Sequence, residues 1–292
     1  MRFSKGLGRE SEILDLDNVL TIAQITDLHI TDGSQPKERA RNEARLRTAL
    51  SAINQLKPPP AAILVTGDLV DRGQPGEYEA LKQILSGTDI PTYFTVGNHD
   101  SRPAFREAFP GTPVDDNGFI QYAFMVDDLR VVMCDTLEGK DHGGFCEKRA
   151  AWLAKTLDEA PNTPTVLALH HPPVPSGIVW MDEPEDAPWL ERLAGVLRGR
   201  KQIKAMICGH MHRAYNGMFA DQLVSVSSAT SVQLALDLRP IDLRVPDGRE
   251  LLTERAPGYT LLVWNNGSLA VHSCPAGNFP AAVTYQVPFI KD

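Results

Sequence analysis

One stretch near residue 65 constrains the fold more than any other. The apolar run Ala61–Val65, with β-branched members and three prolines before it, predicts a buried strand. Gly67 then allows other groups to approach the backbone closely. Asp68 stands at the carboxyl end of the strand, where open α/β sheets bind their ligands. Taken alone, Gly-Asp after a strand is better explained as an ordinary turn, but the ends of the other predicted strands change that interpretation.

Four further predicted strands end in side chains that can bind a metal. They cover residues 18–26, 90–96, 163–169 and 203–208, and are followed by Asp27-Leu28-His29, Gly97-Asn98-His99-Asp100, His170-His171 and Gly209-His210-Met211-His212. Residues two apart in an extended backbone point to the same side, so each D-x-H or H-x-H pair is expected to share one target. Two adjacent residues do not easily face one site, so His170 is taken as the ligand and His171 as its neighbour. Random turns would not place five of the eight histidines in such motifs, with His171 as a sixth beside them.

The segments between the strands predict helices and one irregular connection. Amphipathic helices are expected at residues 36–57, 76–85, 145–157 and 188–197, and an antiparallel strand pair at residues 121–126 and 129–134. Residues 174–188 are proline-rich and acidic and contain Trp180 and Met181. This connection is interpreted either as a lid or specificity loop over the site, or as a plain surface loop.

The pattern changes after residue 230. Apolar residues alternate with polar or small ones over residues 232–245, and residues 259–264 and 268–274 flank an Asn-Asn-Gly turn that is a strong hairpin signal. The chain is therefore divided into a catalytic core at residues 1–230 and a C-terminal β extension at residues 231–292 that completes the sheet. The alternation exceeds what the main sheet needs, so it is expected to form an excursion that packs on a second subunit, giving a homodimer or a higher homo-oligomer.

Composition limits the partners of the chain. The net charge of -8 and the pI near 5.5 argue against long nucleic acids, which require a basic surface. The four cysteines form no C-x-x-C pair, and free thiols are expected. The sequence shows no signal-peptide core and no apolar segment long enough to span a membrane. A cytoplasmic protein without a membrane partner is expected.

The motif residues offer oxygen and imidazole ligands without thiolate, which suits Mn, Fe, Zn or Co. They are more numerous than one tetrahedral ion requires, so two ions are expected, about 3.5–4 Å apart. Asp68 is the natural bridging carboxylate. Two divalent ions give about +4, Asp27 and Asp68 about -2 and a bridging hydroxide about -1, which leaves roughly +1. A phosphodiester, with one negative charge, matches this site.

The five motifs, present in order over about residues 20–215, resemble those of calcineurin-like metallophosphoesterases. Three further features resemble the bacterial subgroup of class III cyclic-nucleotide and glycerophosphodiester phosphodiesterases. These features are Gly97-Asn98-His99-Asp100-x-Arg102, His170-His171-Pro172-Pro173 and Met181-Asp182. The resemblance implies an α/β fold, specifically an αββα sandwich of two mixed sheets flanked by helices. It also implies a dinuclear centre of divalent or mixed-valence transition metal ions.

The resemblance assigns roles residue by residue. Asp27, His29 and His212 would hold the first ion, Asn98, His170 and His210 the second, and Asp68 would bridge both. His99 would lie outside the metal shell as the catalytic group that contacts the phosphate or the leaving-group oxygen. Asn98 and His212 would join His99 in binding substrate. The role of Asp71 stays open between orienting a metal-bound histidine and capping the next helix.

The expected activity is hydrolysis of small phosphodiesters, of the 3′,5′-cyclic nucleotide or glycerophosphodiester type, by in-line attack of a metal-bridging hydroxide. A phosphomonoesterase or a nuclease with the same motifs is the first alternative, because the motifs fix the phosphorus and not its substituents. Comparing rates on monoesters and diesters separates these activities. A non-catalytic scaffold is the second alternative, and metal analysis discriminates it because a scaffold need not hold two ions.

Overall fold

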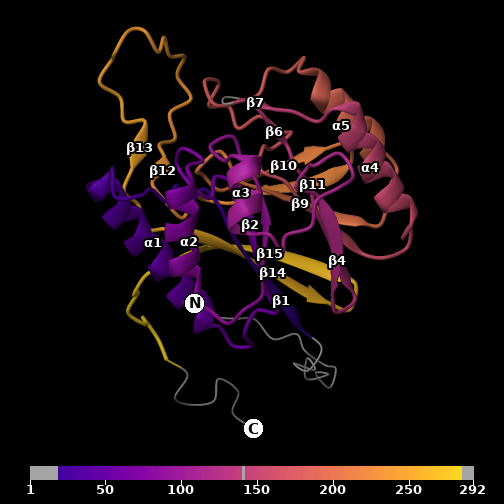
Figure 1. Ribbon diagram of the computed structural model, residues 1–292, viewed down its shortest axis with the longest axis horizontal. Coiled ribbons are helices and arrows are strands. Elements are labelled where there is room, and N and C mark those ends of the chain that lie inside the picture. Colours follow the sequence, from indigo (N-terminus) through magenta and orange to yellow (C-terminus); the bar gives the residue numbers. More distant parts are fainter. Residues whose placement is uncertain (1–18, 140–141, 285–292) are drawn as a thin grey trace, which may run out of the picture.

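The computed structural model describes residues 19–139 and 142–284. Two large β-sheets pack against each other, with helices on both outer sides, which is the αββα sandwich that the resemblance implies (Figure 1). The helices in the described residues are α1 (Pro36–Asn54), α2 (Pro75–Leu85), α3 (Arg102–Ala108), α4 (Glu147–Asp158) and α5 (Pro188–Leu197). The short helix α3 was not predicted. The largest difference from an expected helix boundary is at the end of α1, which stops at Asn54 rather than at residue 57.

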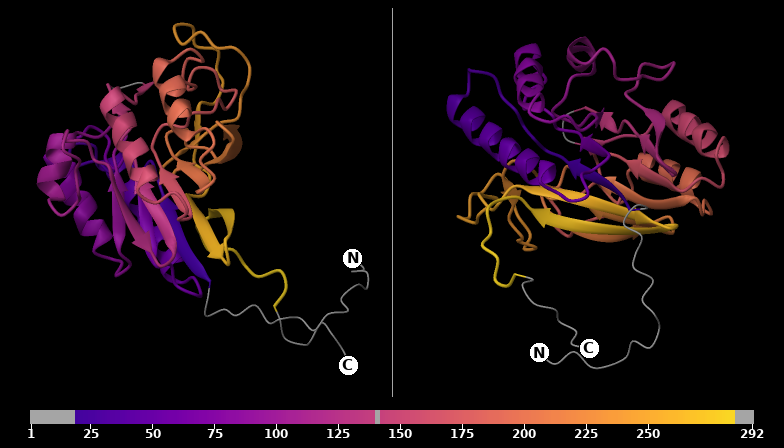
Figure 2. Two further views of the ribbon diagram at one scale, coloured as in Figure 1. Left: turned by 90° about the vertical axis from the view of Figure 1, so that its right-hand side faces the viewer. Right: turned by 90° about the horizontal axis from the view of Figure 1, so that it is seen from below.

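The first sheet has the strand order β15-β14-β1-β2-β3. Its strands are β1 (Leu20–Ile25), β2 (Ala62–Thr66), β3 (Thr92–Thr95), β14 (Gly258–Asn265) and β15 (Ser268–Pro275). The strands β1, β2 and β3 run parallel, so their carboxyl ends meet at one edge. The hairpin β14–β15 extends this sheet because β14 pairs antiparallel with β1 (Figure 2).

The second sheet has the strand order β10-β11-β9-β8-β5-β4. Its strands are β4 (Tyr122–Val126), β5 (Leu129–Met133), β8 (Thr165–Ala168), β9 (Ile203–Cys208), β10 (Tyr215–Phe219) and β11 (Gln222–Val226). The central strands β5, β8 and β9 are parallel, whereas β4 and β10 pair antiparallel at the two edges. The expected antiparallel pair around residues 127–128 is therefore confirmed as β4 and β5.

Alternating side chains of β5 show how the layers pack. Val131 and Met133 belong to the apolar core between the two sheets, which also includes residues of α1 and α2. Val132, and Cys134 directly after the strand, belong to a second apolar core that joins the other face of this sheet to α4 and α5. Because successive strand residues point to opposite faces, one strand contributes to both cores.

Polar side chains join the two sheets near the carboxyl ends of their strands. The Gln24 amide donates to Thr66 Oγ1 and to the Cys208 carbonyl, both at 2.9 Å, and the Thr95 hydroxyl donates to the Cys134 carbonyl at 2.8 Å. All of these atoms are buried, where an unsatisfied polar group would be costly. These bonds bring the strand ends of both sheets, and the motifs that follow them, to one place.

Residues 232–245, which belong to the expected C-terminal β extension, lie mostly outside strands. Only β12 (Gln233–Leu234) is a strand, and it pairs with β13 (Leu252–Thr253). Residues 235–251 form an irregular excursion that projects from the molecule (Figures 1 and 2). Alternation makes a strand only where a neighbouring strand accepts its hydrogen bonds. Here Asp-x-Arg pairs at 237–239, 242–244 and 247–249 form local turns instead.

Two smaller features complete the described chain. A two-stranded ribbon joins β6 (Leu137–Glu138) to β7 (His142–Gly143). Residues 1–18 and 140–141 of the expected core and residues 285–292 of the expected β extension lie outside the described residues. None of the helices in the described ranges has the length and the apolar composition that crossing a membrane requires.

Candidate metal centre

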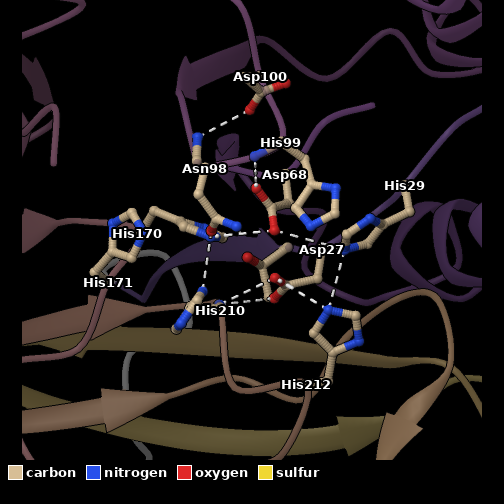
Figure 3. Close-up of polar contacts among 12 residues, drawn as sticks. Asp27, His29, Asp68, Asn98, His99, Asp100, His170, His171, His210 and His212 are labelled. Carbon is tan, nitrogen blue, oxygen red and sulfur yellow. Dashed lines mark hydrogen bonds and ion pairs between the residues drawn. The ribbon is translucent and has the colours of Figure 1, made fainter. Parts of the chain in front are cut away.

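The site lies in the turns that follow β1, β2, β3, β8 and β9, and Figure 3 shows its side chains converging from all five. All seven expected ligands are present in this cluster, together with His99. On one side of Figure 3 are His29 and His212, and on the other are His170 and His210, with Asp68 between them. The structure thus brings together residues that are up to 185 positions apart, from Asp27 to His212.

The backbone of these turns is left-handed rather than extended. Positive φ angles occur at Asp27 (52°), His29 (45°), Asp68 (48°), His210 (70°) and His212 (49°). The expectation that each D-x-H or H-x-H pair points one way because its backbone is extended is therefore wrong. Side chains with a Cβ adopt this conformation at a cost of about 1–3 kcal/mol each, and such residues cluster at functional sites. Tight turns, not strand alternation, aim these side chains.

The first ligand group contains Asp27, His29, Asp68 and His212, and one ligand atom of each lies within 4.8 Å of those of the others. His29 Nε2 is 3.0 Å from His212 Nε2 and 3.6 Å from Asp68 Oδ2. The Asp27 Oδ1 atom is 3.6 Å from His212 Nε2. Both oxygens of Asp27 also accept the His210 backbone N–H at 3.0 Å. The turn after β9, which carries His210, is therefore held against the Asp27 carboxylate.

The second ligand group contains Asn98, His170 and His210. Asn98 Oδ1 lies 3.2 Å from His170 Nε2 and 3.1 Å from His210 Nδ1. His210 and His212 therefore serve opposite sides of the centre, although they are two residues apart. His171 also approaches His170 and His210, and its Nδ1 is 2.8 Å from the Thr136 hydroxyl. Its buried Nε2 has no hydrogen-bond partner within the described part of the chain.

Asp68 occupies the position between the two groups. Its Oδ2 atom is 3.6 Å from His29 Nε2 on one side and 3.3 Å from His170 Nε2 on the other. The Oδ1 atom accepts the His99 backbone N–H at 2.9 Å. One carboxylate oxygen therefore faces both groups while the other is held by the backbone. This is the placement that a bridging ligand requires.

His99 is more open to solvent than the other histidines of the cluster. Its Nδ1 lies 2.7 Å from the Asp71 carbonyl. A carbonyl only accepts, so Nδ1 carries the hydrogen and Nε2 is the atom that exchanges a proton with another group. The ring contacts His29 edge-on, with centroids 4.5 Å apart. His99 thus stands beside the first ligand group, and one ligand atom each of His29, Asp71 and His99 lie within 4.8 Å of one another.

Further polar groups orient the histidines. His170 Nδ1 lies 2.8 Å from the Thr66 carbonyl, and His212 Nδ1 lies 2.8 Å from the Val232 carbonyl. His29 Nδ1 is 3.4 Å from a carboxylate oxygen of Asp71. These contacts direct the Nε2 atoms toward the centre. They also favour the first of the two roles left open for Asp71, since the cap of α2 involves Gln74 and Glu77 instead.

Asp100 is a supporting residue to which the sequence assigned no role. Its carboxylate accepts the backbone N–H groups of Leu69 (3.2 Å) and Gly97 (2.9 Å) and the hydroxyl of Tyr78 (3.1 Å). It therefore ties the turn after β2 to the turn after β3. Burial, reinforced by the charge of Asp68, raises the pKa of Asp100 to about 7. The one signal for this role in the sequence is that an acidic residue directly follows Gly97-Asn98-His99.

Two residues of the subgroup-like motifs have structural partners. The Arg102 guanidinium forms a two-point pair with the Asp135 carboxylate, with both N–O distances 2.7 Å, and also donates to the Leu137 carbonyl. Asp182 accepts the backbone N–H groups of Ser176 (2.7 Å) and Gly177 (2.9 Å). Both residues shape the segments around the centre and are not part of either ligand group.

Two glycines leave the space in which the ligands meet. A Cβ on Gly97 would overlap Asp68 Oδ1 and would lie 2.7 Å from His170 Cδ2. A Cβ on Gly209 would overlap the Thr26 hydroxyl and lie 3.0 Å from Asp27 Oδ2. Glycine is therefore required at these motif positions by close approach to the ligands.

The charges in the cluster are strongly coupled. Burial opposes the ionised form of Asp68, but the charge and hydrogen bond of His170, together with the charges of His29 and His99, outweigh it and hold the pKa of Asp68 well below its usual range. Burial alone would lower the pKa of His170, yet Asp68 raises it to about 9. Burial, with added repulsion from His170, lowers the pKa of His210 to about 3. An ionised Asp68 and a neutral His210 are the forms that bind a cation, and a cation competes with the proton on His170.

The arrangement of acceptor atoms fits a metal centre. Because Nδ1 of His212 faces a carbonyl and Nδ1 of His29 faces a carboxylate, both Nε2 atoms carry a lone pair. These lone pairs face each other at 3.0 Å, which is repulsive unless a cation or a proton lies between them. In the second group Asn98 Oδ1 lies between the imidazoles of His170 and His210. Imidazole and oxygen ligands suit first-row transition metals.

Comparison of sequences agrees with this geometry. Residues 20–214 match the calcineurin-like phosphoesterase family. A protein from Arcobacter nitrofigilis named "probable glycerophosphodiester phosphodiesterase GpdQ" is 30% identical, covering 89% of this chain and 94% of its own. A probable cyclic nucleotide phosphodiesterase from Rhodopseudomonas palustris is 31% identical (86% and 90%). A cAMP/cGMP dual specificity phosphodiesterase from Mycobacterium tuberculosis is 32% identical (78% and 73%).

Solved structures share the fold at low sequence identity. A purple acid phosphatase from yellow lupin has a TM-score of 0.62 at 13% identity, covering 88% of this chain and 51% of its own. GAP50, the anchor in the inner membrane complex of Plasmodium, has a TM-score of 0.59 at 13% identity (94% and 90%). The family match spans all five motifs, and the sequence relatives align over most of the chain. This protein therefore belongs to the calcineurin-like phosphoesterase family.

Proposed function

We propose that this chain hydrolyses small phosphodiesters with two transition metal ions. The family uses a dinuclear metal centre, and the clustered Asp and His side chains of this chain are suited to hold one. The observation that carries the proposal is Asp68, whose Oδ2 atom faces His29 and His170 on opposite sides. Asp27, His29 and His212 would hold one ion, and Asn98, His170 and His210 the other.

The roles of the chain's own residues follow from the hydrogen bonds. Bound cations would stabilise charge on the phosphoryl oxygens and supply a nucleophile at neutral pH. His99 Nε2 points away from the Asp71 carbonyl that holds Nδ1, so it is placed to contact the phosphate or to protonate the leaving oxygen. Burial opposes protonation of His99, but Asp68 and Asp71 outweigh it and raise the pKa of His99. His212 lines the same cavity as His99, and Asn98 and His212 would complete the contacts with the phosphate.

The metal identity is proposed from the ligand types. Imidazole nitrogens with carboxylate and amide oxygens suit Mn, Fe, Zn or Co, in divalent or mixed-valence pairs. Cys134 and Cys208 are buried in the apolar cores, and burial raises the pKa of both thiols. The candidate ligand groups among the described residues contain neither thiol, so the proposed centre has no thiolate ligand.

A diester substrate is supported by the relatives, whose names include glycerophosphodiester and cyclic nucleotide phosphodiesterases. The net charge of -8 supports a small substrate rather than a long nucleic acid. The protein reconstituted with Mn²⁺ is expected to hydrolyse bis(p-nitrophenyl) phosphate faster than p-nitrophenyl phosphate. The reverse order would favour the phosphomonoesterase alternative, and turnover on neither would favour a scaffold.

We also propose that the protein forms a homodimer or a higher homo-oligomer through residues 235–251. This excursion carries exposed apolar side chains at Leu236, Leu238, Leu243 and Val245, which are 58–63% exposed. Exposed apolar groups concentrated on one projecting segment are typical of a protein interface. Sedimentation velocity at micromolar concentration should show an oligomer that Leu238→Asp with Leu243→Asp dissociates. A monomeric native protein would contradict this proposal and leave the metal centre unaffected.

A further inference from the structure

A cavity of about 620 Å³ opens beside the metal centre. On the side of the centre it is lined by His29, Asp71, His99 and His212. Its volume lies in the range of about 300–1,000 Å³ that is usual for small-molecule sites. A phosphate held at the centre would therefore extend its organic substituent into this cavity. The other walls decide which substituent is bound.

Those walls carry large apolar side chains from two distant segments. Trp180 and Met181 come from the connection 174–188, and Leu234, Leu251 and Leu252 come from the region of β12 and β13. Leu251 is 36% exposed and Leu252 is 53% exposed, so both offer apolar surface to a ligand. The placement of Trp180 and Met181 favours the interpretation of residues 174–188 as a lid or specificity loop, because this connection borders the site.

Local hydrogen bonds fix the wall that carries Trp180. Asp182 accepts two backbone N–H groups of the same turn, and the Met181 N–H donates to the Ile178 carbonyl at 2.8 Å. Glu183 accepts the Trp189 indole N–H at 3.4 Å, which joins the connection to α5. The aromatic wall is therefore formed before a ligand binds, which lowers the entropic cost of binding.

The opposite wall is attached to α1 and to the metal-binding turn. The Arg45 guanidinium donates to the carbonyls of Ser231 (2.7 Å) and Arg255 (2.6 Å). These two hydrogen bonds hold both segments of the β12–β13 ribbon beside α1 (Figure 1). The Leu234 N–H donates to the His212 carbonyl at 3.1 Å. The position of Leu234 is thus fixed by a hydrogen bond to His212, a residue of the metal centre.

The charges of the lining argue against a polyanionic substituent. Among the described lining residues, Arg41 is the one arginine or lysine, and Glu38 stands in the same lining. A second phosphate would require more cationic groups than this. Gln35 and Arg41 supply donors and an acceptor for a neutral polar group. The cavity suits a substituent that is flat, largely apolar and polar at its edge.

We propose that this cavity binds the organic substituent of the phosphodiester and selects a nucleoside over glycerol, a specificity that rests on the proposed phosphodiesterase function. A nucleobase has two apolar faces that can cover Trp180 and the leucines, and its edge can form hydrogen bonds with the polar lining. Glycerol is small and polar, and it would leave the same apolar walls in contact with water. Trp180 and Leu252 are specificity-determining residues in this account.

The kinetic test compares 3′,5′-cAMP with glycerophosphoethanolamine, using the full chain loaded with Mn²⁺. The variants Trp180→Ala and Leu252→Asp should raise the KM for 3′,5′-cAMP about tenfold, with kcat changed less than about twofold. Their kcat/KM for glycerophosphoethanolamine should stay within about twofold of the native value. Matched controls are Val179→Ala and Leu223→Asp, whose side chains are 76% and 36% exposed and do not line the cavity. These controls should leave both substrates unchanged.

A binding measurement separates this inference from the proposed activity. Calorimetric titration of the Mn²⁺-loaded protein should give a Kd for AMP about tenfold lower than for glycerol 3-phosphate, since only the substituent differs. Trp180→Ala should remove this preference. If neither diester is hydrolysed but the preference persists, the proposed activity fails and the cavity assignment stands. Equal Kd values for AMP and glycerol 3-phosphate would overturn the assignment. It would also be overturned if the variants lost kcat/KM equally on both diesters, or if Trp180→Ala and Val179→Ala had equal effects.

Discussion

His29 and His212 face each other through their Nε2 atoms at 3.0 Å, although 183 positions separate them in the sequence. Each ring is held from its other nitrogen, His29 by the Asp71 carboxylate and His212 by the Val232 carbonyl. The protein therefore positions two lone pairs where they repel unless a positive charge joins them. This pair has direct consequences for stability.

Metal binding should stabilise the fold. Mn²⁺ at about 100 times its Kd stabilises the native state by about 2.7 kcal/mol, and the melting temperature should rise by several degrees. A chelator should reverse the rise, because it removes the cations that join the buried imidazoles. Differential scanning fluorimetry with and without Mn²⁺ measures both effects.

The control for this shift uses a histidine outside the cluster. His212→Ala should lose most of the Mn²⁺-dependent rise, whereas His272→Ala, an exposed change on β15, should keep it. An equal rise in the two variants would show that Mn²⁺ stabilises the chain at another place.

Replacing His99 should separate chemistry from metal binding. His99 is bonded to the Asp71 carbonyl and faces the cavity. His99→Ala should lower kcat on bis(p-nitrophenyl) phosphate by about 10²–10⁴-fold, the range typical of general acid–base groups. The metal content should match that of the native protein. A variant that loses its metal instead would make His99 a ligand.

Gly97→Ala should disable the centre through sterics alone. The added Cβ would overlap Asp68 Oδ1 and approach the His170 ring, so the two ligands cannot keep their positions. We expect a loss of activity of at least about 100-fold, together with weaker Mn²⁺ binding. Gly33→Ala is the matched control, because nothing lies within 4 Å of its added Cβ. Comparable activity in the two variants would contradict the close approach described for Gly97.

Asp100 should act by positioning. Asp100→Ala leaves the N–H groups of Leu69 and Gly97 without their acceptor and should destabilise the fold by about 1–3 kcal/mol for a buried unsatisfied group. It should also lower kcat, because the turn that carries Asp68 loses its anchor. Tyr78→Phe removes only the hydroxyl contact and should have a smaller effect on both quantities. Urea denaturation and steady-state kinetics measure the two effects.

The sequence was most informative where a local pattern has one spatial outcome. The sequence predicted strands from the apolar runs that come before Asp27, Asp68, Asn98, His170 and His210. Parallel strands of one sheet place their carboxyl ends at the same edge. The order of the motifs was enough to predict the αββα sandwich through resemblance. Helix positions followed because amphipathic periodicity reports a buried face directly.

The rest depended on contacts that no local pattern records. The left-handed turns at Asp27 and His210 arise because other chain segments hold the backbone, as the Gly67 carbonyl does for the Asp27 N–H. Alternation at residues 232–245 gave a strand only at Gln233–Leu234, where a partner strand is present. The cavity walls come from residues near 40, 180 and 250, and their meeting requires the whole fold.

Metal stoichiometry tests the central claim most directly. The protein is loaded with excess Mn²⁺, desalted and analysed by inductively coupled plasma mass spectrometry. The native chain should retain about two ions, Asp68→Ala no more than about one, and the control His272→Ala about two, because Asp68 alone faces both ligand groups. A native chain with one ion or none, or an Asp68→Ala variant that keeps two, would contradict a centre bridged by Asp68.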